Sequence, residues 1–192
     1  MIKAVIFDVF GVIYPDVGLD WFNNHVQDPT RLPEFKSAAA KVDIGEMSRD
    51  TQFGIWSDLS GIPKDEIGQQ VDAALIMNDP LIERIVKPLA KTARRAILTN
   101  ANRDWLRQPL RRDGIGRNFD EIVISAEVGA VKPDQKIFDI TLGRLGVAAT
   151  EAVFIDDSAG NVEAAARMGI TAIQYNGIDA LEERMRSLQL LQ

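Results

Sequence analysis

The stretch that decides the fold is Lys3–Val12, KAVIFDVFGV, in which an unbroken apolar run ends at one carboxylate and a glycine follows shortly after. A short apolar run of this kind predicts a β-strand that is buried on both faces, as in a parallel sheet. In open α/β sheets, ligands bind outside the carboxyl ends of the strands. Asp8 is therefore a candidate nucleophile, and the alternative is that it only caps a turn.

Three later segments carry polar side chains at comparable positions. Because parallel strands end at one edge of a sheet, we expect these side chains to meet Asp8 there. Together they offer a hydroxyl, an amide, an ammonium group and two carboxylates, which indicates a site for phosphate and metal. They are Thr99 and Asn100 after the apolar run 95–98, Asp156 and Asp157 after the run 152–155, and Lys132 before Pro133.

This set of motifs resembles the haloacid dehalogenase superfamily, in which a nucleophilic Asp, a Ser or Thr, a Lys and an acidic pair occur in this order. The resemblance runs from Lys3 to about Gln174, and residues 132–138, KPDQKIF, and 155–165, IDDSAGNVEAA, make it specific. Within the superfamily, the segment 99–102, TNAN, and the double Asp are similar to the branch that contains the amino-terminal phosphatase domain of soluble epoxide hydrolases and bacterial sugar-1-phosphate phosphatases.

The resemblance implies an α/β fold with a doubly wound, Rossmann-like parallel sheet of five strands in the order 3-2-1-4-5. The apolar runs agree with this, and so do helical patterns over 102–112, 134–145, 158–168 and 178–190. Asn102, Asp134 and Ser158 are the expected N-caps of three of these helices. The strands are expected at about Lys3–Phe7, Arg95–Leu98, Glu121–Ser125, Ala152–Ile155 and Ile170–Gln174.

Residues 15–78 interrupt the strand-helix alternation, since they contain helical patterns and no convincing strand. We expect a small all-helical domain there and a Rossmann-like core in residues 1–14 and 79–192. In the superfamily, this position holds a mobile cap that closes over the substrate and excludes water. The aromatic residues of the segment are expected to form the core of the cap, and they are Trp21, Phe22, Phe35, Phe53 and Trp56.

Composition narrows the chemistry further. The 192 residues contain no Cys and one His, so disulfides, thiolate sites and two-histidine metal sites are excluded, and His25 is assigned to packing. The net charge of −6, without a dense basic run, does not favour nucleic-acid binding. No apolar run approaches the roughly 20 residues of a membrane span. We expect a cytoplasmic protein, monomeric or homodimeric, that acts on a small phosphorylated molecule.

The resemblance also implies a role for each residue. Asp8 would attack phosphorus and form an acyl phosphate that water hydrolyses. Mg²⁺ would be held by Asp8, the backbone carbonyl of Phe10 and Asp157, while Asp156 would bind it through water or anchor Lys132. Two further residues, Thr99 and Asn100, would donate hydrogen bonds to the phosphoryl oxygens, and the charge of Lys132 would stabilise the transition state.

Phe10 departs from the phosphatase pattern, which usually has a second Asp at this position as general acid and base. Its loss predicts slow turnover, or a preference for esters with good leaving groups. One alternative is a 2-haloacid dehalogenase, because that family has an aromatic residue at this position; Arg31 or Arg49 would then bind the substrate carboxylate, and the acidic pair argues against it. The other alternative is a phospho-ligand binding protein with little or no turnover. The identity of the substrate stays open.

Overall fold

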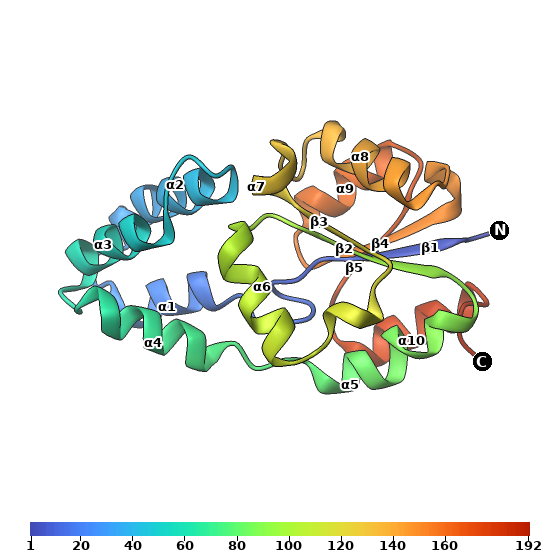
Figure 1. Ribbon diagram of the computed structural model, residues 1–192, viewed down its shortest axis with the longest axis horizontal. Helices are drawn as coiled ribbons and strands as arrows, with labels where there is room; N and C mark the ends of the chain where they lie inside the picture. Colours follow the sequence, from blue (N-terminus) through green and yellow to red (C-terminus); the bar gives the residue numbers. More distant parts are fainter.

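The computed structural model describes residues 1–192, apart from the side chain of Asp104. Five parallel strands form one sheet in the order β3-β2-β1-β4-β5, which confirms the expected topology (Figure 1). The first strand is central, and its Phe7 pairs with Ile97 on one side and Ile155 on the other. The strands are β1 (Ala4–Phe7), β2 (Arg94–Thr99), β3 (Glu121–Ile124), β4 (Ala152–Asp156) and β5 (Thr171–Gln174).

Helices cover both faces of the sheet because the central strands are apolar on both sides. Alternate residues of β1 belong to different clusters: Ile6 packs with α8 and α9, and Phe7 packs with the helices of the opposite face. Figure 1 shows α8 and α9 above the sheet and α5, α6 and α10 below it. These helices are α5 (Asp79–Leu81), α6 (Arg103–Arg112), α7 (Ser125–Val128), α8 (Gln135–Leu145), α9 (Ala159–Arg167) and α10 (Ile178–Ser187).

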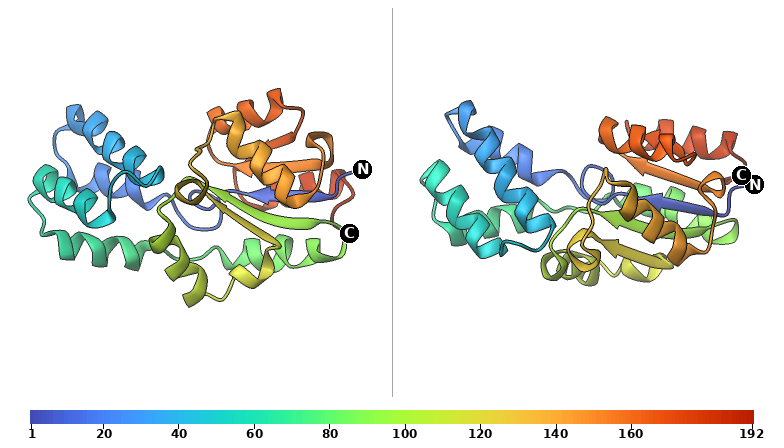
Figure 2. Two further views of the ribbon diagram at one scale, coloured as in Figure 1. Left: turned by 45° about the horizontal axis from the view of Figure 1, so that its top comes forward. Right: turned by 90° about the horizontal axis from the view of Figure 1, so that it is seen from above.

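Of the helices between β1 and β2 in the sequence, α1 to α4 lie beyond the carboxyl ends of the strands (Figures 1 and 2). We call this segment, Val17–Ala74, the helical insertion. It falls inside the range 15–78, whose domain boundaries stay a prediction. Its helices are α1 (Val17–His25), α2 (Leu32–Asp43), α3 (Arg49–Ser60) and α4 (Lys64–Ala74), with a short 3₁₀ turn, η1, at Pro29–Arg31.

Aromatic side chains pack together inside the helical insertion. The ring of Trp56 stacks on Trp21 and on Phe35, with centroid distances of 4.9 and 4.4 Å. The imidazole of His25 stacks on Trp21 and its Nδ1 lies 2.8 Å from the Trp21 carbonyl oxygen, so His25 has a packing role, as expected. This aromatic core holds together four helices that would otherwise have little to bury.

Asn78 connects the two segments that join the helical insertion to the sheet. Its side-chain amide donates to the Val12 carbonyl at 3.2 Å and to the Tyr175 hydroxyl at 3.0 Å. Its carbonyl oxygen accepts from the Leu81 backbone N–H at 3.3 Å, which caps α5. One side chain thus fixes the position of both connections relative to the core.

The structure adds elements that the sequence patterns did not predict. After α5, the chain continues as a π-helical turn, η2 (Ile82–Val86), and a 3₁₀ turn, η3 (Pro88–Lys91); Pro88 separates them because it has no N–H to continue a helix. Further 3₁₀ turns are η4 (Gly116–Asn118) and η5 (Ala149–Glu151). Among the described residues, no helix combines the length and apolar composition that a membrane crossing needs.

One of the three expected N-caps forms the expected hydrogen bond. The side-chain oxygen of Asn102, Oδ1, accepts from the Trp105 backbone N–H at 3.4 Å. Asp134 and Ser158 occupy N-cap positions, but their side chains accept no capping hydrogen bond. The backbone N–H of Ser158 donates to Asp156 Oδ1 at 2.9 Å.

The role of Asn78 predicts that Asn78→Ala destabilises the fold. We expect the free energy of unfolding to fall by about 1–2 kcal/mol, because a helix cap and two hydrogen bonds between segments are lost. Urea denaturation measures this, with Asn24→Ala at an exposed helical position as the control. Equal stability of both variants would contradict the assignment.

Candidate active site

Asp8 lies directly after β1, at the edge where the strands end. Its backbone N–H donates to the Ile155 carbonyl at 2.9 Å, which continues the β1–β4 ladder by one residue. Its Oδ1 accepts from the Val9 N–H at 2.6 Å. The side chain is 9% exposed, and it reaches the cavity described below. Asp8 is thus fixed by the backbone on both sides and still open to a ligand.

Lys132 bridges two carboxylates at this edge. Its Nζ lies 2.6 Å from Asp8 Oδ1 and 2.7 Å from Asp156 Oδ2, and its side chain is 1% exposed. The amide of Asn100 holds the backbone of Lys132, since it accepts from the Lys132 N–H at 2.8 Å and donates to the Lys132 carbonyl at 2.9 Å. The structure therefore shows that Asn100 positions Lys132. Its expected hydrogen bond to a phosphoryl oxygen stays a prediction.

The two neighbouring carboxylates, Asp156 and Asp157, have different surroundings. Asp156 is fully buried and also accepts from the Ser158 N–H at 2.9 Å and from the Asn161 amide at 3.0 and 3.1 Å. Its oxygens are occupied, so it anchors Lys132, one of the two roles expected for it. Asp157 is partly exposed and lines the cavity.

A metal ion could be held here by oxygen ligands. One carboxylate oxygen from each of Asp8, Asp156 and Asp157 lies within 4.8 Å of the others. Carboxylate oxygens are ligands that a hard cation such as Mg²⁺ prefers, so Asp8 and Asp157 would hold the ion here, beside the occupied carboxylate of Asp156. The carbonyl of Phe10 stays a predicted ligand.

Burial and mutual repulsion act on the carboxylates of this cluster. Burial raises the pKa of Asp8 to about 7, with Asp156 adding to the increase and Lys132 opposing it. Burial also raises the pKa of Asp157, again with a contribution from Asp156. The pKa of Lys132 is raised by Asp8 and Asp156, although burial alone would lower it. Three close carboxylates with one ammonium group favour the arrival of another positive charge.

Thr99 ends β2 with its side chain completely buried. Its hydroxyl has no hydrogen-bond partner among the described residues. An unpaired hydroxyl in the interior costs free energy, and such groups in native proteins mark a ligand or water position. This agrees with the expectation that Thr99 donates to a ligand oxygen.

Gly11 lies so close to the Asp157 carboxylate that a side chain at position 11 would clash with it. A Cβ at this position would lie 2.3 Å from Asp157 Oδ2, and the φ of Gly11 is +82°. Both the backbone conformation and the space therefore require glycine.

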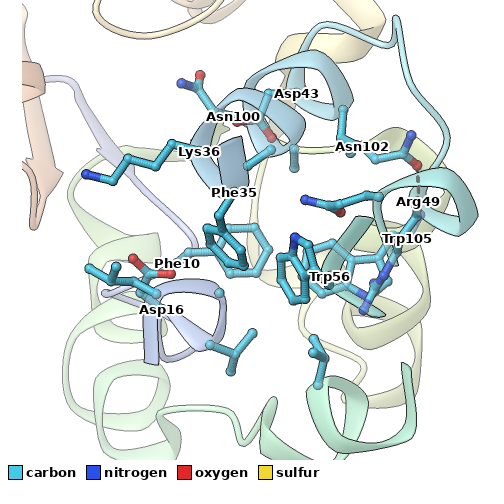
Figure 3. Close-up of a pocket in the computed structure, with 18 of the residues that line it drawn as sticks. Phe10, Asp16, Phe35, Lys36, Asp43, Arg49, Trp56, Asn100, Asn102 and Trp105 are labelled. Carbon is cyan, nitrogen blue, oxygen red and sulfur yellow. Dashed lines mark hydrogen bonds between the residues drawn. The ribbon is translucent and has the colours of Figure 1, made fainter. Parts of the chain in front are cut away.

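A cavity of about 410 Å³ lies between this edge of the sheet and the helical insertion (Figure 3). The ring of Phe10 forms part of its wall and stacks on Trp105 of α6 at 5.0 Å, nearly parallel. The core contributes polar residues together with Phe10 and Trp105, and the insertion contributes aromatic, aliphatic and charged residues. The core side includes Asp8, Asn100, Lys132, Asp157 and Asn161, and the insertion side includes Phe35, Asp43, Arg49, Phe53 and Trp56.

Asp43, at the end of α2, is a cavity residue that the sequence patterns did not single out. Its backbone carbonyl accepts from the buried Ser125 hydroxyl, which in turn accepts from the Ala101 N–H at 2.9 Å. Burial raises the pKa of Asp43 to about 7, with Lys132 opposing and Asp16 adding to the increase. Asp43 was missed because it follows no strand. Asn161 had a readable signal, since it lies in the segment 155–165.

The comparisons with known proteins agree with this geometry. A family model for haloacid dehalogenase-like hydrolases matches residues 2–169. The chain belongs to this hydrolase family. This confirms the family membership that the four motifs at the ends of strands predicted.

Relatives of this hydrolase differ in their named activities. It is 29% identical to "Acyl-CoA dehydrogenase family member 10" of Mus musculus over 98% of this chain, and 30% identical to "Bifunctional epoxide hydrolase 2" of Mus musculus over 62%. It is 28% identical to "(S)-2-haloacid dehalogenase 1" of Pseudomonas sp. (strain CBS-3) over 46% of this chain and 39% of that protein. The chain spans only 19% and 22% of the first two relatives.

Among solved structures, a magnesium complex of the HAD family enzyme bt-2542 from Bacteroides thetaiotaomicron superposes with a TM-score of 0.72. The identity is 19%, and the match covers 91% of this chain and 93% of that one. At this identity the likeness shows the fold.

The contact of Gly11 with Asp157 predicts that Gly11→Ala destabilises the fold by more than the strain of a positive φ alone would. Gly129→Ala is the matched control, because Gly129 has a φ of +63° and open space around it. We expect Gly11→Ala to lower the free energy of unfolding by about 1 kcal/mol more than the control does. Urea denaturation compares the two, and equal losses would show that Asp157 moves aside freely.

The raised pKa of Asp43 predicts a pH-dependent gain from Asp43→Asn. The ionised carboxylate is disfavoured in the folded state, so the penalty is absent below about pH 4 and complete above about pH 7. The gain in melting temperature over wild type should therefore be larger at pH 8 than at pH 5. Asp8 titrates in this range in both proteins, so its effect largely cancels in the difference.

The control for this substitution is Glu46→Gln, at an exposed position three residues further along the chain. Its melting temperature should differ from that of wild type by the same small amount at both pH values. A gain from Asp43→Asn that is the same at pH 5 and pH 8 would contradict the burial of a charged Asp43.

Proposed function

We propose that this hydrolase is a Mg²⁺-dependent phosphatase that acts on a small phosphorylated metabolite through an aspartyl phosphate on Asp8. The observation that carries the proposal is the buried ammonium of Lys132 between Asp8 and Asp156, with the Thr99 hydroxyl unpaired nearby. A positive charge and a free donor beside a positioned carboxylate suit a phosphoryl group.

The contacts of Asp8 determine which oxygen attacks. Among the described residues, both the Val9 N–H and Lys132 Nζ contact Oδ1. These contacts fix the plane of the carboxylate and leave Oδ2 as the nucleophile. In the first step the Oδ2–P bond forms and the bond from phosphorus to the leaving oxygen breaks. In the second step water attacks phosphorus, the Oδ2–P bond breaks, and inorganic phosphate leaves.

The surroundings of Asp8 stabilise this transfer. Lys132 offsets negative charge that develops on the phosphoryl oxygens, and Thr99 donates a hydrogen bond to one of them. Mg²⁺, held by Asp8, Asp157 and the carbonyl of Phe10, would supply the positive charge that reduces the repulsion between a carboxylate and a phosphate dianion. We propose that the helical insertion acts as the cap and that its closure over the substrate excludes water.

Phe10 limits the kind of ester that this site can cleave. Its ring cannot protonate the leaving oxygen, and it stacks on Trp105 instead. Leaving groups that depart without protonation, such as aryl, acyl and anomeric sugar oxygens, are therefore the expected substrates. A residual rate on alkyl phosphates would be lower by a factor of about 10²–10⁴.

Hydrolysis of p-nitrophenyl phosphate, acetyl phosphate and glucose 1-phosphate tests the proposal. Phosphate release should require Mg²⁺, stop with chelator and be abolished in Asp8→Asn. Phe10→Asp should gain activity on poor leaving groups, and Phe10→Asn should not, because it removes the ring without adding an acid. Phosphate release that persists in Asp8→Asn would overturn the mechanism.

A 2-haloacid dehalogenase is the second candidate, because Phe10 is aromatic and a relative carries that name. The carboxylate of Asp157 in the cavity opposes it, since it would repel an anionic acid substrate. Chloride release from 2-chloropropionate in the presence of chelator separates this candidate from the phosphatase.

A further inference from the structure

Two unpaired hydrogen-bond donors lie on the insertion side of the cavity, in α3. Arg49 Nη1 and Trp56 Nε1 are both buried, and neither has a partner among the described residues. Both residues line the cavity. In Figure 3, Arg49, Trp56 and Trp105 lie to one side, away from Asp16 and Lys36. Buried donors without partners are rare in native proteins and call for an explanation.

The guanidinium group of Arg49 is held in place by two aromatic rings. Its Cζ lies 3.8 Å from the centre of the Trp105 ring and 4.6 Å from that of Phe53. Its Nη2 contacts Asp72 Oδ1 at 3.2 Å, and the same oxygen accepts from Trp105 Nε1. The stacked rings and one carboxylate fix the orientation of the group and leave Nη1 unused.

The position of Arg49 is unfavourable unless something binds to it. It is the first residue of α3, where the helix dipole disfavours a positive charge. Burial lowers its pKa to about 10, so the group stays protonated near neutral pH while it has lost much of its hydration. Asp72, which is 59% exposed, compensates only in part. An acceptor with negative charge would satisfy the remaining donor.

Two stacked aromatic rings lie between Arg49 and the turn that follows Asp8. Trp105 contacts Arg49, and it also stacks on Phe10, which lies two residues after Asp8. The wall between Lys132 and Arg49, two of the three positively charged residues that line the cavity, is thus aromatic. Such a wall suits a flat or apolar body.

We propose that Arg49 and Trp56 form a subsite for an anionic group, a carboxylate or a second phosphate, on the leaving group of the ester. This rests on the proposed phosphatase function and defines the substrate class: a phosphate monoester whose flat or apolar leaving group ends in an anion. Both groups only donate hydrogen bonds, so an ammonium group, which has no acceptor, does not fit.

The test compares three aryl esters: phenyl phosphate, 4-carboxyphenyl phosphate and 1,4-phenylene bisphosphate. Wild type should show a kcat/KM at least about tenfold higher for one of the two anionic esters than for phenyl phosphate, as expected for a charge-assisted hydrogen bond in a desolvated site. The preferred ester distinguishes a carboxylate from a phosphate. In Arg49→Gln this preference should be lost. Comparing the ratio of kcat/KM for the anionic ester and phenyl phosphate between the two proteins cancels the difference in leaving-group chemistry, because it is the same in both.

Two further variants make the comparison specific. Lys41→Gln removes an exposed positive charge of the insertion that does not line the cavity, and its preference should equal that of wild type. Arg49→Lys keeps the charge without the planar donors, so it should keep part of the preference. If wild type hydrolyses phenyl phosphate with Mg²⁺ and shows no preference, the subsite is wrong and the proposed function stands.

Binding gives a result that does not depend on turnover. Calorimetry in the Asp8→Asn background, with Mg²⁺ present, measures the Kd of 4-carboxyphenyl phosphate, of 1,4-phenylene bisphosphate and of phenyl phosphate. Adding Arg49→Gln should weaken the binding of the preferred anionic ester about tenfold more than that of phenyl phosphate. Equal weakening, or none, would overturn the subsite, even if no ester is hydrolysed and the proposed function fails.

Discussion

The site depends on one buried interaction, the ammonium group of Lys132 between Asp8 and Asp156. Residues from three distant parts of the chain meet in it, and each carboxylate would carry an uncompensated buried charge if Lys132 were absent. The parallel sheet makes the meeting possible because β1 and β4 are neighbours and end at one edge. Asn100 then holds the backbone of Lys132, so β2 takes part as well.

Much of the fold was readable from the sequence because the strands are short, continuous apolar runs. The order of the strands, and the meeting of Asp8, Lys132 and Asp156 at one edge, followed from the strand-helix alternation together with the family resemblance. The helical turns after α5 were missed, although Leu81, Ile85 and Leu89 are buried at helical spacing. Pro88 and the change of helix type hide that pattern.

The other half of the cavity could not be derived in this way. Asp43 and Trp105 acquire their roles from packing between the helical insertion and the core, and no local pattern records which helix faces which. Arg49 was identified as a candidate for anion binding, but its contacts with Phe53 and Trp105 depend on tertiary structure. Phe10 was recognised as unusual from its position, and only the structure gives its ring a partner.

The close approach of Gly11 to Asp157 limits how this site can change during evolution or engineering. A Cβ at position 11 would lie 2.3 Å from Asp157 Oδ2, so a side chain there requires the Asp157 carboxylate to leave its observed position. A smaller residue at 157 would remove this clash together with one carboxylate of the site, and the positive φ of Gly11 would still disfavour a side chain. The effects of changes at these two positions are therefore expected to be non-additive.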